Sequence, residues 1–166
     1  MTERDNSIAG LLKADLQTQA SRKDVLIRVP GFEKSGIQIK YRLPESAAEL
    51  AQISTKVERE TKDLTARGLR MFMDTIVLLC DGVYYQTQTD AEPQPLDVEG
   101  TGEPCFIDER LAGYLGMNGD DYSARDVVRH LFGGNDFAII SHGEKLQRWV
   151  VDQSTDVNKE FWQLGE

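Results

Sequence analysis

Residues 25–41, VLIRVPGFEKSGIQIKY, decide the fold. Two runs within them, 25–29 and 37–41, place apolar side chains at every second position, the period of a β-strand. The seven residues between the runs are rich in Pro, Gly and Ser, which favour turns. The pattern predicts two antiparallel strands, each with one apolar face (Val25, Ile27 and Val29; Ile37, Ile39 and Tyr41). A lone hairpin is marginally stable in water, so this apolar face is expected to pack on helices.

The sequence that follows the hairpin predicts mostly helix. After Pro44, apolar residues recur at helical spacing in one stripe, and the residues between them are mostly charged or polar. From residue 69 to residue 80 the apolar side chains cover nearly the whole helix circumference, which is typical of a helix at the centre of a core or an oligomer interface. Gly68 is expected to separate these two helices, since glycine costs about 1 kcal/mol inside a helix. The stripe consists of Ala47, Leu50, Ile53 and Val57.

The second half of the chain predicts a short strand, an exposed loop and several helices. The strand is expected at 83–88, and the loop at 89–104 is rich in Pro, Gly and carboxylates. Apolar residues between 106 and 115 indicate a short helix. Three further helices are expected to begin at the capping residues Ser123, Asn135 and either Ser154 or Thr155. The fold class is therefore α+β, mostly α, with an N-terminal β-hairpin packed on a helical core.

Residues 1–24 are expected to form an amphipathic segment outside a single domain at 25–166. Apolar residues recur at helical spacing between positions 8 and 16, and Asn6 or Ser7 can cap the helix. A helix of this length is marginal by itself in water. The segment is therefore expected either to pack on the domain or to become ordered against a partner. Its apolar residues are Ile8, Leu11, Leu12 and Leu16.

Composition and charge exclude several functions. The 166-residue chain has a net charge of −9, and residues 90–126 hold ten acidic residues against two arginines. Such a surface repels nucleic acid, so the segment is either a solvated loop or a docking site for a basic partner. A membrane-spanning helix needs about 20 apolar residues in succession, and the longest apolar run covers only 76–80. We therefore expect neither nucleic-acid binding nor a membrane span.

No set of residues in the sequence forms a recognisable catalytic or metal-binding motif. His130 and His142 lie twelve positions apart, without the close spacing of a helical zinc site. Cys80 and Cys105 have apolar neighbours and are expected to be free thiols in a reducing cytosol, with a disulfide as the alternative. We therefore expect no enzyme activity, no cofactor and no metal, and a function in binding other proteins.

The order of features along the chain resembles the tail assembly chaperones of long-tailed bacteriophages, especially those infecting actinobacteria. The resemblance begins with SIAGLL at 7–12, VLIRVPGF at 25–32 and IQIKYRLP at 37–44. It continues with the helical residues 123–132 and 135–149 and with the closing FWQLGE at 161–166. The loop at 89–104 does not match the family pattern.

The resemblance implies a specific role. Tail assembly chaperones coat the tape measure protein in the host cytoplasm, keep it soluble, and leave it as tail tube subunits polymerise. They are absent from the mature virion, and many are also made in a longer, frameshifted form. The implied partners are the tape measure protein, the tail tube protein and that longer form, and a homo-oligomer is a further expectation. The predicted partner-binding residues lie near the two chain ends: Leu11, Leu12, Leu16, Phe161, Trp162 and Leu164.

Two alternatives share the same composition. One is a structural virion protein of the tail or the head–tail joint, which would remain in the particle. The other is a small enzyme whose site is formed by Asp120, Asp121, His130 and His142.

Overall fold

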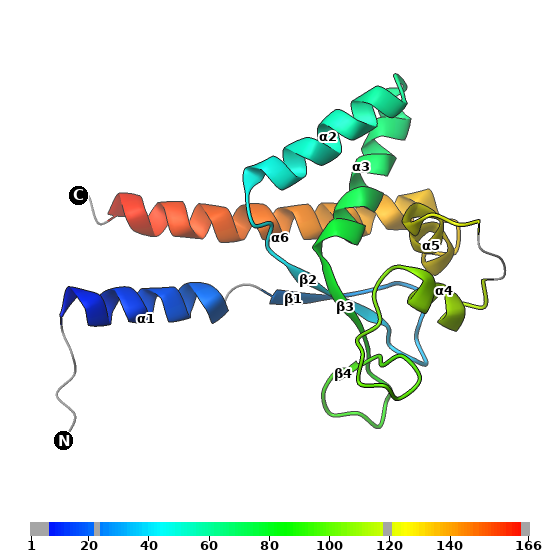
Figure 1. Cartoon of the computed structure of the whole chain (residues 1–166), viewed down its shortest axis with the longest axis horizontal. Coiled ribbons are helices and arrows are strands. Elements are labelled where there is room, and N and C mark those ends of the chain that lie inside the picture. Colours follow the sequence, from blue (N-terminus) through cyan, green and yellow to red (C-terminus); the bar gives the residue numbers. More distant parts are fainter. Residues whose placement is uncertain (1–6, 22–23, 118–120, 164–166) are drawn as a thin grey trace.

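The computed structural model describes the backbone of residues 7–21, 24–117 and 121–163, and the side chains of 7–17, 24–117 and 121–153. These residues form six helices and one antiparallel sheet of four strands in the order β1-β2-β3-β4 (Figure 1). The expected class, α+β and mostly α with the N-terminal hairpin on a helical core, is confirmed. The elements are α1 Ile8–Ser21, β1 Asp24–Arg28, β2 Gln38–Arg42, α2 Ala47–Glu60, α3 Leu64–Leu79, β3 Cys80–Tyr85, β4 Gln94–Pro95, α4 Glu109–Tyr114, α5 Ala124–Leu131 and α6 Asp136–Gln163.

The hairpin pairs β1 with β2 within one residue of the predicted bounds. Val25 lies opposite Tyr41, and Ile27 lies opposite Ile39. The connecting loop is fixed to the end of β3, because the backbone N–H of Gln86 donates to the carbonyl of Ser35 at 3.0 Å. A Cβ on Gly36 would lie 2.1 Å from the carbonyl oxygen of Gln86, and its φ is +59°, so only glycine fits this position.

The third strand begins earlier than expected and follows α3 directly. Cys80 is both the C-cap of α3 and the first residue of β3, where it pairs with Tyr41. The segment expected to be an exposed loop contributes β4, so that expectation is wrong for part of it. Within that segment Leu96 and Val98 pack against the core. The Leu96 carbonyl also accepts a hydrogen bond from the Cys105 N–H at 3.0 Å.

The break between α2 and α3 falls at residues 61–63 rather than at Gly68, which lies inside α3. Asp63 defines the start of α3, because its side chain accepts a hydrogen bond from the N–H of Thr65. Helix α3 buries Met73, Ile76 and Leu79 and packs against α2, α5 and α6, as expected of a central helix. The helix layer is therefore organised around α3.

Helices α5 and α6 form the C-terminal part of the domain. Ser123 and Asp126 form the predicted capping box, and Asn135 Oδ1 accepts from the N–H of Ala138 at 3.2 Å. Helix α6 runs without interruption for 28 residues, so the separate helix expected to begin at Ser154 or Thr155 is wrong. Where α6 crosses α3, a Cβ on Gly143 would lie 2.4 Å from the Phe72 ring, so glycine permits this close approach.

Candidate functional site

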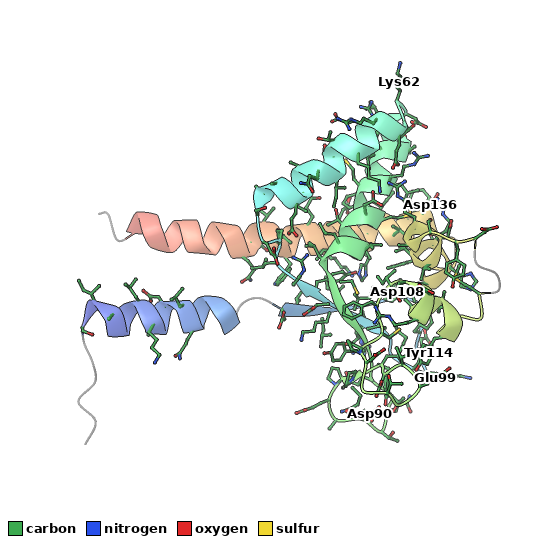
Figure 2. The ribbon with its side chains drawn as sticks, in the orientation of Figure 1. Lys62, Asp90, Glu99, Asp108, Tyr114 and Asp136 are labelled. Atoms are coloured by element: carbon green, nitrogen blue, oxygen red, sulfur yellow. The ribbon has the colours of Figure 1, made fainter. Side chains whose placement is uncertain are left out.

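Helix α1 exposes an apolar face. Its hydrogen-bonded start is set by Ser7, whose Oγ accepts from the N–H of Gly10 at 3.1 Å. The side chains drawn on α1 stand apart from the other side chains drawn in Figure 2. We define the α1 apolar face as Ile8, Leu11, Leu12 and Leu16, which are 55–76% exposed. Three of these are the N-terminal residues that the sequence predicted to bind a partner, and the described structure leaves them in contact with solvent.

The predicted C-terminal partner-binding residues lie largely outside the described residues. The backbone of α6 is described as far as Gln163, but the side chains of Phe161 and Trp162 are not, and Leu164 lies beyond the described chain. Figure 1 shows α1 and the second half of α6 projecting from the same side of the protein. The backbone thus brings the two predicted regions to one side of the molecule, without defining a joint surface.

The two histidines have different environments, and neither lies in a metal cluster. His142 is 3% exposed, and its Nε2 lies 2.6 Å from the hydroxyl of Tyr41. Burial lowers the pKa of His142 to about 4, although a hydrogen bond with the backbone of Arg28 acts in the opposite direction. His130 is exposed on α5, with its Nε2 3.3 Å from the Leu115 carbonyl. Among the described residues no group of three His, Cys, Asp or Glu could hold a metal ion.

The buried histidine is therefore a core hydrogen-bonding residue. The neutral ring hydrogen-bonds with the backbone of Arg28, and its Nε2 accepts a hydrogen bond from the Tyr41 hydroxyl. Burial also raises the pKa of Tyr41 well above its usual value, so its hydroxyl stays protonated. The alternative enzyme site loses His142 to the core, while Asp121 is exposed and Asp120 lies outside the described residues.

Both cysteines are buried free thiols, as expected. Burial raises the pKa of Cys80 and of Cys105 to about 11. A thiol is a weak nucleophile where its pKa is high, because the thiolate is the reactive form. Cys80 is the first residue of β3, and both cysteine side chains lie in the core.

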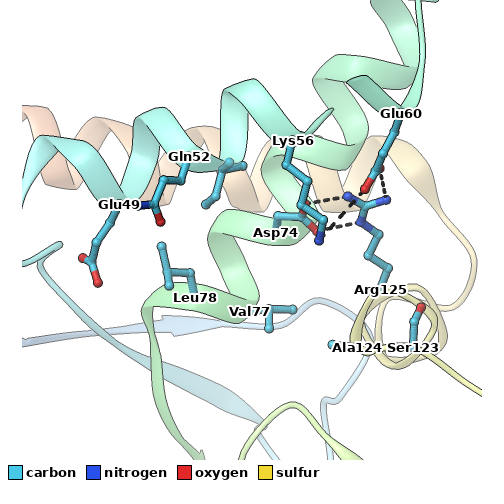
Figure 3. A pocket seen from close by; sticks show the side chains of 11 residues that line it. Glu49, Gln52, Lys56, Glu60, Asp74, Val77, Leu78, Ser123, Ala124 and Arg125 are labelled. Carbon is cyan, nitrogen blue, oxygen red and sulfur yellow. Dashed lines mark hydrogen bonds and ion pairs between the residues drawn. The ribbon is translucent and has the colours of Figure 1, made fainter. Parts of the chain in front are cut away.

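A groove of about 530 Å³ lies between α2, α3 and α5 (Figure 3). Arg125 crosses it and binds Asp74 through two hydrogen bonds of 2.6 Å, and Glu60 through a third of the same length. The hydrogen bond from Arg125 lowers the pKa of Glu60. These hydrogen-bonded ion pairs join α5 to α2 and α3. The charged residues of this groove therefore hold the three helices together.

A second groove, of about 560 Å³, is mainly apolar and lies beside α4 and the ends of β3 and β4. Its walls include Phe32, Ile37, Leu96 and Tyr114. Asp97 also lines it, and its Oδ1 is buried without a hydrogen-bond partner among the described residues. Its other oxygen accepts from the N–H of Gly102 at 3.0 Å.

The two most exposed large apolar side chains among the described residues are not among the predicted partner-binding residues. Leu64 is 77% exposed at the start of α3, and Phe137 is 84% exposed in the first turn of α6. Spacing alone does not show which end of a helical apolar stripe extends past its neighbours. No helix among the described residues is long and apolar enough to cross a membrane.

Comparison of the chain with protein-family models, curated proteins and solved structures finds no match.

Proposed function

We propose that this protein is a tail assembly chaperone of a long-tailed bacteriophage, which binds the tape measure protein in the host cytoplasm and keeps it soluble until tail tube subunits polymerise. The observation that carries the proposal is the α1 apolar face, whose four side chains are 55–76% exposed. An apolar stripe of this kind can pack against the apolar face of an amphipathic helix in a partner protein, with the two helices side by side. A tape measure protein offers long helices of this kind along its whole length.

The position of α1 also supports the proposal. Only residues 22 and 23 separate it from β1, and it stands outside the packed helices and sheet (Figure 1). A projecting helix can approach a long helical partner without rearrangement of the core. The net charge of −9 adds repulsion between chaperone copies and favours solubility of the loaded complex.

Co-expression with the tape measure protein tests the proposal. The tape measure protein should remain in the supernatant only when this chain is co-expressed. The soluble complexes should hold several copies of this chain for each tape measure protein. Leu12→Asp should reduce the amount of soluble tape measure protein, because it places a charge in the centre of the α1 apolar face. Gln17→Asp is the matched control, since Gln17 is exposed on the other side of the same helix.

The same co-expression tests whether the C-terminal region binds the tape measure protein. Trp162→Asp should lower complex formation if the end of α6 contributes to binding. Tape measure protein that is equally insoluble with and without this chain would contradict the proposal. Mass spectrometry of purified virions distinguishes the chaperone from the structural virion protein. A chaperone is expected to be absent from the virions, whereas a tail or head–tail joint protein is expected to be present.

A further inference from the structure

The outer edge of the sheet is formed by β1, which has β2 as its one strand neighbour among the described residues. The N–H of Val29, next to the strand, donates to the Ile37 carbonyl at 3.0 Å and so points toward β2. Backbone groups alternate in direction along an antiparallel strand. The N–H and C=O groups of Asp24, Leu26 and Arg28 therefore point away from β2, and we call them the β1 edge.

This edge has the features that promote pairing with another strand. Its three residues are exposed, and Leu26 is 39% exposed although it is apolar. Between them, Val25 and Ile27 are only half-buried against the core. An exposed apolar edge strand of this kind is a template for a further strand. The backbone of Arg28 already bonds with His142, so the β1 edge groups without a hydrogen-bond partner in the described part of the chain centre on Leu26.

The sequence of β1, DVLIR, is complementary to itself when read in the antiparallel direction. If two copies pair with Leu26 opposite Leu26, Val25 of each lies opposite Ile27 of the other. Asp24 of each copy then lies opposite Arg28 of the other copy, so both ends of the pairing join opposite charges. Opposite charges placed directly across two strands are stabilising, and like charges are destabilising.

From this complementarity we propose that two copies of the protein associate through antiparallel β1–β1 pairing centred on Leu26, which joins their sheets into one of eight strands. The two Leu26 residues exchange backbone hydrogen bonds, and the two Asp24–Arg28 pairs fix the register. This contact is two-fold symmetric and closes at two copies. The inference is independent of the proposed function, because it uses neither the α1 apolar face nor a tape measure protein.

Sedimentation velocity of the full-length chain over a dilution series provides the test. The wild-type protein should approach twice the 18.7 kDa chain mass at high concentration. Asp24→Arg and Arg28→Asp should each weaken the dimer by about tenfold or more, since each places two like-charged pairs across the interface. An equimolar mixture of these two variants should recover the dimer, because each copy then meets an opposite charge at both positions.

The double variant Asp24→Arg/Arg28→Asp restores complementarity within one chain and should also dimerise. Arg28→Asp leaves the 3.6 Å ion pair between Asp24 and Lys40 intact, so this variant keeps the inference testable if Asp24→Arg loses its fold with the loss of that pair. Every comparison is repeated in the Leu12→Asp background, which removes association through the α1 apolar face. Wild-type protein that stays monomeric, single variants that dimerise like wild type, or a mixture that stays monomeric would each overturn the inference.

Discussion

The hydroxyl of Tyr41 lies 2.6 Å from Nε2 of His142, a hydrogen bond between residues 101 positions apart that joins β2 to α6 inside the core. The ring of Phe132 also packs edge-on against His142, with 5.0 Å between the ring centroids. The pair therefore links the sheet to the C-terminal helices through one buried polar contact.

The burial of His142 makes stability depend on pH. The pKa of His142 is lowered from 6.5 to about 4 by burial, so between these values the unfolded chain binds a proton that the folded chain does not. Stability is therefore fully present above pH 6.5 and falls as the pH drops toward 4, by up to about 3 kcal/mol. Urea unfolding across this range should show the slope. His142→Gln should flatten it, whereas His130→Gln should leave it unchanged.

Tyr41→Phe should destabilise the fold by about 1–3 kcal/mol, because it leaves Nε2 of His142 buried without a donor. Chemical denaturation at pH 7 measures the loss. Tyr85→Phe is a suitable control, since Tyr85 is half-buried, and it should change stability by no more than about 0.5 kcal/mol. Equal effects of the two substitutions would show that the hydrogen bond contributes nothing.

Gly143→Ala should destabilise the protein by about 1–3 kcal/mol, because the new methyl group would overlap the Phe72 ring. The same change at Gly68 in α3 meets open space and should stabilise by about 0.5–1 kcal/mol. Thermal melts of the two variants should therefore shift in opposite directions. A smaller loss for Gly143→Ala in a Phe72→Ala background, which removes the two ring carbons nearest to the new methyl group, would confirm that the overlap is the cause.

Ile76→Ala should cost about 2–5 kcal/mol, because Ile76 is fully buried in the last turn of α3. Met71→Ala in the same helix should cost far less, since Met71 is exposed. Unfolding midpoints in urea measure both. Equal urea midpoints for the two variants would show that α3 is not the central element that its burial pattern indicates.

The sequence predicts those parts of the fold that depend on local spacing. The alternation in residues 25–41 predicts the hairpin, and Ser123 with Asp126 predicts the start of α5. The end of α3 and the start of β3 could not be separated, because Cys80 continues the same apolar run. Gly68 was misread as a break, since tertiary packing of α3 outweighs the cost of one glycine.

The candidate site was predictable only in part. The spacing of Leu11, Leu12 and Leu16 predicts an apolar face, but only the structure shows that this face is exposed. The hydrogen bond between Tyr41 and His142 and the ion pairs of Arg125 join residues distant in the chain, which periodicity within a segment cannot reveal. The β1 edge is likewise a property of strand order, which the sequence does not state.

Cys80 belongs to two elements at once. Its N–H closes the last turn of α3 on the Ile76 carbonyl, and the same residue begins the pairing of β3 with β2. Fraying of the last turn of α3 therefore also opens the end of the sheet, so helix and sheet form one cooperative unit. In native-state hydrogen exchange, amides in the last turn of α3 and in the middle of β3 should share one opening free energy, while those of α1 exchange at far lower cost.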